Sequence, residues 1–70
     1  MTSEEVFQKI QDYMSLPIKK PVTITLRNGG TILKAVPCGF TTTNGVTYIN
    51  YETVTSNVRQ SVRLTDIAAF

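Results

Sequence analysis

The sequence predicts a mainly β protein in which an N-terminal α-helix precedes a five-stranded, strongly bent antiparallel barrel or sandwich. We expect one domain over residues 1–70, and three features predict its class. Apolar residues near the N-terminus recur at the three- and four-residue steps of a helix. From residue 22 onward they alternate at every second position, with turn residues between the runs. Proline and glycine interrupt the second run, which is typical of a strand that bends.

The predicted helix spans about residues 3–15, and the predicted barrel spans about residues 22–70. Thr2 and Glu5 have the spacing of a capping box, in which a hydroxyl and a carboxylate each bond a backbone N–H that lacks a helical partner. The apolar residues after this cap share one face, so the helix is amphipathic and is expected to dock on the sheet. That face comprises Val6, Phe7, Ile10, Tyr13 and Met14. Two prolines then end the helix, because proline has no N–H to donate to it.

Five strands with short connections are predicted after the helix. The first strand alternates Val22, Ile24 and Leu26 with polar residues and ends at the turn signal Asn28–Gly30. We expect a bend or bulge near Cys38, because a proline and a glycine flank it. The later strands are predicted over Thr31–Val36, Val46–Glu52, Val58–Leu64 and Ile67–Phe70, with turns at Thr41–Gly45 and Ser56–Asn57.

The composition limits the classes of function. A chain this short buries only about 60% of the surface that it exposes when unfolded, so we expect oligomerisation to support the core. Cys38 is the one cysteine, and we expect its side chain to be buried as a small apolar residue. A single thiol also fits a reducing cytoplasm. No apolar run is long enough to cross a bilayer, so we expect a cytoplasmic protein without membrane contact. The net charge of +2 permits an anionic partner without indicating one.

The residues do not predict an enzyme. The chain has no histidine to serve as a base or metal ligand, and its few carboxylates do not cluster in the predicted fold beyond the helix cap. Asn28–Gly30 lacks the Lys and Ser/Thr of a phosphate-binding loop and lies between strands. We therefore expect a binding protein with no catalytic residue, no cofactor and no metal site.

The segments Pro21–Ile32 and Val62–Ile67 resemble the Sm-like family, which includes Hfq. Pro21–Ile32 resembles the opening of that fold, in which a helix leads into alternating strand residues, then Asn-Gly, then a bent second strand. Val62–Ile67 resembles the closing Sm motif, an apolar residue, Arg, a turn and Ile, which joins the fourth and fifth strands. The resemblance covers nearly the whole chain and implies the Sm-like, SH3-type barrel.

The chain departs from Hfq in both of the standard RNA pockets of that protein. Leu64 and Thr65 stand where Hfq has a Lys-His pair, and Thr25 stands where Hfq has an aromatic residue on the first strand. Lys34 stands near the second-strand glycine of the family, and Thr41 replaces an acidic residue after the bend. The resemblance therefore implies the fold first and RNA binding second.

The resemblance implies a homo-oligomeric ring that binds single-stranded RNA. The fourth and fifth strands are the natural free edges of a bent five-stranded barrel, and each subunit would pair its fourth strand with the fifth strand of the next. The predicted interface residues are Val62, Leu64, Ile67 and Ala68.

Candidate RNA contacts are polar or aromatic. From the family pattern, Arg63 in the closing turn and Asn44 before the third strand would face the pore, with Tyr48 as a stacking surface. Arg27 and Asn28 at the first hairpin are further candidates. Alternatives stay open: Arg63 as a solvated strand residue, Asn44 as a turn former and Tyr48 as a core residue. For Arg27 and Asn28 the alternative is that they are ordinary surface residues.

A second hypothesis is a protein-binding module. The bacterial Rho inhibitor Rof has a similar helix and barrel, its closing strands also resemble Val62–Ile67, and it works by binding a protein. A Rof-like regulator, or a small phage or plasmid accessory protein, would use the helix or a sheet edge as its contact surface. The weak basicity and the missing Lys-His pair favour this alternative, whereas a ring would favour RNA binding.

Overall fold

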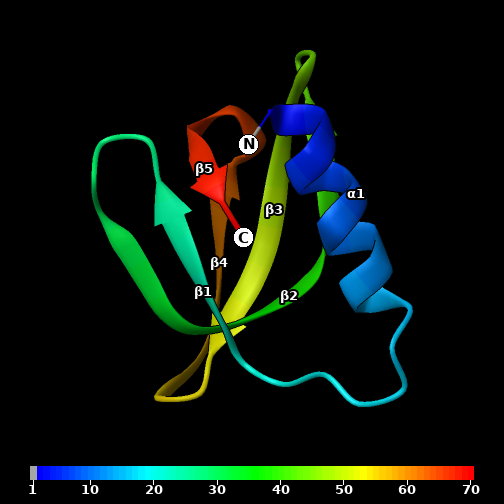
Figure 1. Ribbon diagram of the computed structural model, residues 1–70, viewed down its shortest axis with the longest axis vertical. Coiled ribbons are helices and arrows are strands. Elements are labelled where there is room, and N and C mark those ends of the chain that lie inside the picture. The colour runs from blue at the N-terminus through cyan, green and yellow to red at the C-terminus, as the bar shows by residue number, and fades with distance from the viewer. Residues whose placement is uncertain (1) are drawn as a thin grey trace.

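A computed structural model describes residues 2–70 as one α-helix and five strands joined by short connections (Figure 1). The predicted mainly β class is confirmed. In chain order the elements are α1 (Ser3–Met14), β1 (Val22–Leu26), β2 (Thr31–Thr43), β3 (Val46–Thr53), β4 (Ser56–Arg63), the 3-10 helix η1 (Leu64–Asp66) and β5 (Ile67–Ala69).

All five strands belong to one antiparallel sheet in the order β4-β3-β2-β1-β5. The sheet bends around the core without closing on itself, because β4 and β5 each pair with a neighbour on one side only (Figure 1). The predicted order of helix and strands is confirmed. The last two strands form the two edges of the sheet.

The core lies between the concave face of the sheet and α1. Ile24, Ile49 and Ile67 come from three different strands and have no exposed surface. Val6 and Ile10 of α1 pack against them and are equally buried. Each fully buried isoleucine stabilises the fold by about 1.5–3 kcal/mol relative to an exposed one. The helix contacts β2, β5 and η1, so its predicted apolar face does dock on the sheet.

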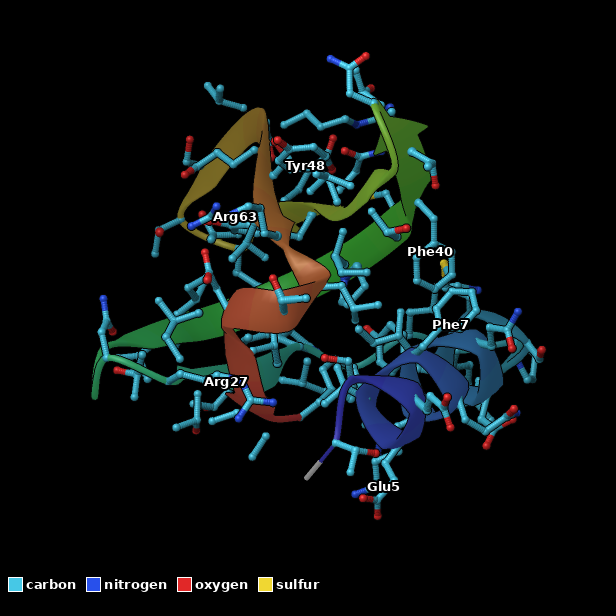
Figure 2. The ribbon with its side chains drawn as sticks, turned by 90° about the horizontal axis from the view of Figure 1, so that it is seen from above. Glu5, Phe7, Arg27, Phe40, Tyr48 and Arg63 are labelled. Carbon is cyan, nitrogen blue, oxygen red and sulfur yellow. The ribbon has the colours of Figure 1, made fainter. Side chains whose placement is uncertain are left out.

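The start of α1 is held by its cap and by an aromatic pair. The Glu5 N–H donates to the Thr2 hydroxyl at 3.2 Å, and the Thr2 N–H donates to the Glu5 carboxylate at 3.0 Å, which confirms the capping box. One turn along, Phe7 meets Phe40 of β2 edge to face, with 4.4 Å between ring centres (Figure 2). These contacts fix the helix before and after its first turn.

The end of α1 is held by Tyr13. Its hydroxyl donates to the Lys20 carbonyl at 2.7 Å, and its ring lies edge to face on Phe70 with 5.8 Å between ring centres. Burial raises the pKa of the Tyr13 hydroxyl, with a smaller contribution from Cys38, so the hydroxyl keeps its proton and remains a donor. The connector after the helix is therefore tied back to it.

A β-bulge bends β2 where the sequence predicts it. Pro37 pairs with Tyr51 and Gly39 pairs with Asn50, so Cys38 is an extra residue opposite no residue of β3. The prediction that Cys38 is buried is wrong. The register of β2 against β1 shifts between Ile32 and Ala35, so Ala35 and Pro37 take the buried positions and the Cys38 side chain is exposed.

The connection between β3 and β4 differs from the prediction. The turn expected at Ser56–Asn57 lies at Val54–Thr55, because Thr53 pairs directly with Ser56 and β4 begins there. The register of the two strands shifts close to this turn. Val58, the first residue of the predicted fourth strand, is 64% exposed because it lies beside this irregularity and not over the core.

Lys34 carries backbone strain that glycine would relieve. Its φ of 53° lies in the left-handed region, which costs a residue with a Cβ about 1–2 kcal/mol. Lys34→Gly removes this cost but adds about 0.5–1 kcal/mol of unfolded-chain entropy. We expect the glycine variant to gain up to ~1 kcal/mol in free energy of unfolding, measured by urea denaturation. Lys34→Ala is the control, because it removes the same side chain and keeps the Cβ. A glycine variant less stable than the alanine variant would contradict the expectation.

The capping box makes stability depend on pH. The bonds from the Thr2 backbone and hydroxyl lower the pKa of Glu5 below its ordinary 4.5. The stability from the cap is therefore present above the unfolded pKa and is lost as pH falls through the lower folded value. We expect the thermal midpoint of Glu5→Gln to fall less than that of the unaltered protein when the buffer is taken from about pH 6 to pH 3. Glu4→Gln is the matched control, and identical slopes for the two variants would rule out the cap as the cause.

Candidate nucleic-acid interface

Tyr48 and Arg63 lie side by side on the outer face of β3 and β4 (Figure 2). They are Cα partners in the antiparallel pair, so their side chains project from the same face of the sheet. The next pair along, Ile49 and Val62, packs on the core, which leaves Tyr48 and Arg63 facing outward. Tyr48 is half-buried, and the Arg63 side chain is 57% exposed. The predicted stacking surface therefore lies on the outside of the sheet and not in the core.

The closing turn η1 is fastened to both ends of the sheet. Arg63 Nε lies 3.0 Å from Asp66 Oδ2 across one turn, which links η1 to the end of β4. From the other side, Arg27 Nε donates to the Thr65 carbonyl at 2.8 Å, and the Arg27 N–H donates to the Asp66 carbonyl at 2.9 Å. Arg27 is therefore the anchor that attaches η1 to the first hairpin.

A hollow of about 230 Å³ lies between the first hairpin and the closing turn. Two apolar residues and four polar ones line it: Leu26, Val62, Arg27, Asn28, Arg63 and Asp66. The Asn28 carboxamide oxygen accepts the Gly30 N–H at 2.8 Å, which fixes the hairpin wall of the hollow. The fold thus brings Arg27 and Asn28 of the first hairpin together with Arg63, which lies far from them in the sequence.

Asn44 lies away from this hollow, at the tip of the β2–β3 hairpin. β2 continues through the bulge to Thr43, beyond its predicted end at Val36, so the turn is reduced to Asn44 and Gly45. Both have positive φ, 52° and 77°, as a two-residue type I′ hairpin turn requires. The turn conformation accounts for Asn44, and the structure gives it no contact with the other candidates.

The predicted interface residues lie at the two edges of the sheet. Val62 and Leu64 are partly buried and pack against the core from β4 and η1. Ile67 has no exposed surface, so neither its side chain nor its backbone is open to a neighbouring chain. Ala68 is the middle residue of β5 and is partly exposed. These side chains contribute mainly to the core of the chain itself, and the edges offer chiefly backbone groups.

Sequence reasoning missed Asp66 as a site residue. It is one of the few carboxylates for which the sequence predicts no cluster, yet it faces Arg63 and lines the hollow. The three-residue spacing between Arg63 and Asp66 was the available signal, because one helical turn brings such a pair together.

A second, larger hollow of about 390 Å³ lies beside the C-terminal half of α1. Its walls include Tyr13, Leu16, Val22 and Phe70, with Lys9 and Asp12 at the rim. Lys9 Nζ donates to the Phe70 carbonyl at 3.4 Å across it. This hollow contains none of the predicted site residues.

Within residues 2–70 no three His, Cys, Asp or Glu side chains are grouped closely enough to hold a metal ion. In the same residues no helix is long and apolar enough to span a membrane. No family model, curated protein or solved structure matches the chain. The function must therefore be inferred from the fold and from the interface.

Proposed function

We propose that the protein is an Sm-like, non-catalytic module that binds single-stranded RNA and assembles edge to edge into a ring. The observation that carries this proposal is the strand order β4-β3-β2-β1-β5, which leaves β4 and β5 as single-sided edges of one bent sheet. An open edge presents backbone donors and acceptors that another strand can pair with. Neither β4 nor β5 contains a proline to block such pairing.

The ring follows from joining unlike edges. β4 of one subunit would pair with β5 of the next, so each subunit would use β4 for one neighbour and β5 for the other. Such head-to-tail contacts close into a ring when the rotation between subunits divides a full turn. β5 has only three residues, so the shared ladder is short. The assembly is therefore expected to dissociate on dilution.

The RNA surface is supported by the pair on the outer face. Tyr48 offers a ring and Arg63 a guanidinium plane, and these are the groups on which unstacked bases rest. Positive charge at Arg27 and Arg63 lies on either side of η1 (Figure 2) and would attract the phosphates. The lone cysteine is consistent with a reducing cytoplasm as the proposed location.

The backbone at Lys34 supports the Sm-like assignment. Lys34 stands near the second-strand glycine of that family, and it keeps the left-handed conformation that glycine favours, with φ of 53°. The left-handed backbone conformation is thus the same as glycine would adopt, although the residue is lysine.

A Rof-like protein-binding module is the second candidate. The observation that favours it is the exposed Val58 on β4, an apolar side chain beside an open strand edge. A strand of a partner protein that pairs with this edge would cover the side chain, as in β-augmentation. The net charge of +2 is also modest for a protein that binds RNA as a monomer.

The assembly is tested by solution mass. We expect light scattering to give a closed ring for the unaltered protein and a shift toward monomer for Ala68→Pro, because proline removes a backbone donor from β5. Ala68→Gly keeps that donor and should remain a ring. Circular dichroism confirms that each variant is folded. A monomer or dimer in the unaltered protein, indifferent to added oligo-U or oligo-A, would favour the Rof-like module. An unchanged mass for Ala68→Pro would exclude β5 as the interface.

RNA binding is tested at Arg63. We expect Arg63→Ala to weaken binding of a labelled single-stranded RNA by about tenfold and to lower the slope of log affinity against log salt by about one. Arg59→Ala is the matched control, because Arg59 is also on β4 but lies 3.9 Å from Glu52 and outside the hollow. Equal effects of the two variants at every salt concentration would remove Arg63 from the site.

A further inference from the structure

We propose that the hollow between the first hairpin and η1 is a binding site for a guanine base, an assignment that rests on the proposed RNA-binding function. The site lies where the end of β1, the end of β4 and the closing turn meet. Its volume of about 230 Å³ is large enough for one base and too small for a larger ligand.

The walls of the hollow suit a flat aromatic ligand. Leu26 and Val62 are partly buried apolar residues that line it from β1 and β4. Apolar side chains of this kind remove the faces of a base from water, while the edges of the base stay near polar groups. The hollow is preformed, because the Asn28–Gly30 bond fixes the hairpin and the Arg27–Thr65 bond fixes η1.

Hydrogen-bonding groups remain available at the rim. The Asp66 carboxylate uses Oδ2 for Arg63 Nε, and within residues 2–70 its second oxygen accepts no hydrogen bond. Arg63 uses Nε for its bond to Asp66, and its two terminal amino groups make no hydrogen bond within residues 2–70. The site therefore presents an anionic acceptor next to cationic donors in a partly enclosed space.

This arrangement matches guanine better than the other bases. Guanine carries two adjacent donors, N1–H and N2–H₂, which a carboxylate accepts together, and two adjacent acceptors, O6 and N7, which a guanidinium serves. Adenine and cytosine place a ring acceptor beside their amino donor, and that acceptor would face the carboxylate. Uracil has one donor between two acceptors. The charge of Asp66 thus selects for guanine and against the other three bases.

The test compares short RNAs that differ at one position. We measure anisotropy of labelled undecamers that contain only uridine, or a central guanosine, adenosine or inosine among uridines. We expect the guanosine strand to bind about tenfold more tightly than the all-uridine strand, since a good bidentate contact discriminates by about this factor. Inosine lacks the 2-amino group and should bind with intermediate affinity.

Asp66→Asn is the decisive variant. It replaces one carboxylate oxygen by a donor, so we expect it to abolish the guanosine preference, measured as the ratio of the affinities for the guanosine and all-uridine strands. Glu52→Gln is the matched control, because it removes the same charge on β3 outside the hollow and should retain the preference. Thermal melts and solution mass confirm that both variants keep the fold and the assembly.

The outcomes separate the two proposals. Equal binding of the guanosine and all-uridine strands, or a preference that survives Asp66→Asn, would refute the guanine site while the RNA-binding function stands. Guanosine monophosphate, tested by calorimetry, distinguishes a free nucleotide from a base within RNA. Its Asp66-dependent binding without RNA binding would support the site and refute the proposed function. Binding of neither would refute both.

Discussion

The bend of β2 is the constraint on which the rest of the structure depends. β2 pairs with β1 up to Ala35 and with β3 from Ala35 onward, and the bulge at Cys38 lies within the part that pairs with β3. This change of direction brings Ile24, Ile49 and Ile67 to one point, although they lie on three strands. Proline is tolerated at Pro37 because a bulge interrupts the ladder there. A straight β2 would leave these side chains on an open face that α1 alone could not cover.

The closing turn links the core to the surface. η1 follows β4 directly and precedes β5 directly, so one short segment sets the position of both sheet edges. Arg27 holds η1 from the first hairpin, and Arg63 holds it from β4. The proposed base site and the proposed subunit contact therefore share one element. Their geometry is set by the same few hydrogen bonds.

Low net charge shapes how such a module would bind RNA. Electrostatic attraction to phosphates grows with the number of cations, and a chain of net charge +2 supplies few of them. In the proposed ring the same site repeats around the axis, so one strand would meet several copies at high effective concentration. Modest contacts at Tyr48 and Arg63 would then add up without a strongly basic surface. The missing Lys-His pair of Hfq is consistent with a different base preference at the closing turn.

The sequence alone determined the order of elements, the helix cap at Thr2 and Glu5, and the position of the bend, because each depends on residues close together in the chain. Only the tertiary structure decided which side chains face outward after the bend. The register shift between Ile32 and Ala35 moves the buried positions of β2 to Ala35 and Pro37, which exposes Cys38 against expectation. Tertiary structure alone also brought Asp66 and Asn28 to one hollow. That meeting depends on the pairing of β1 with β5, a long-range contact that no local pattern encodes.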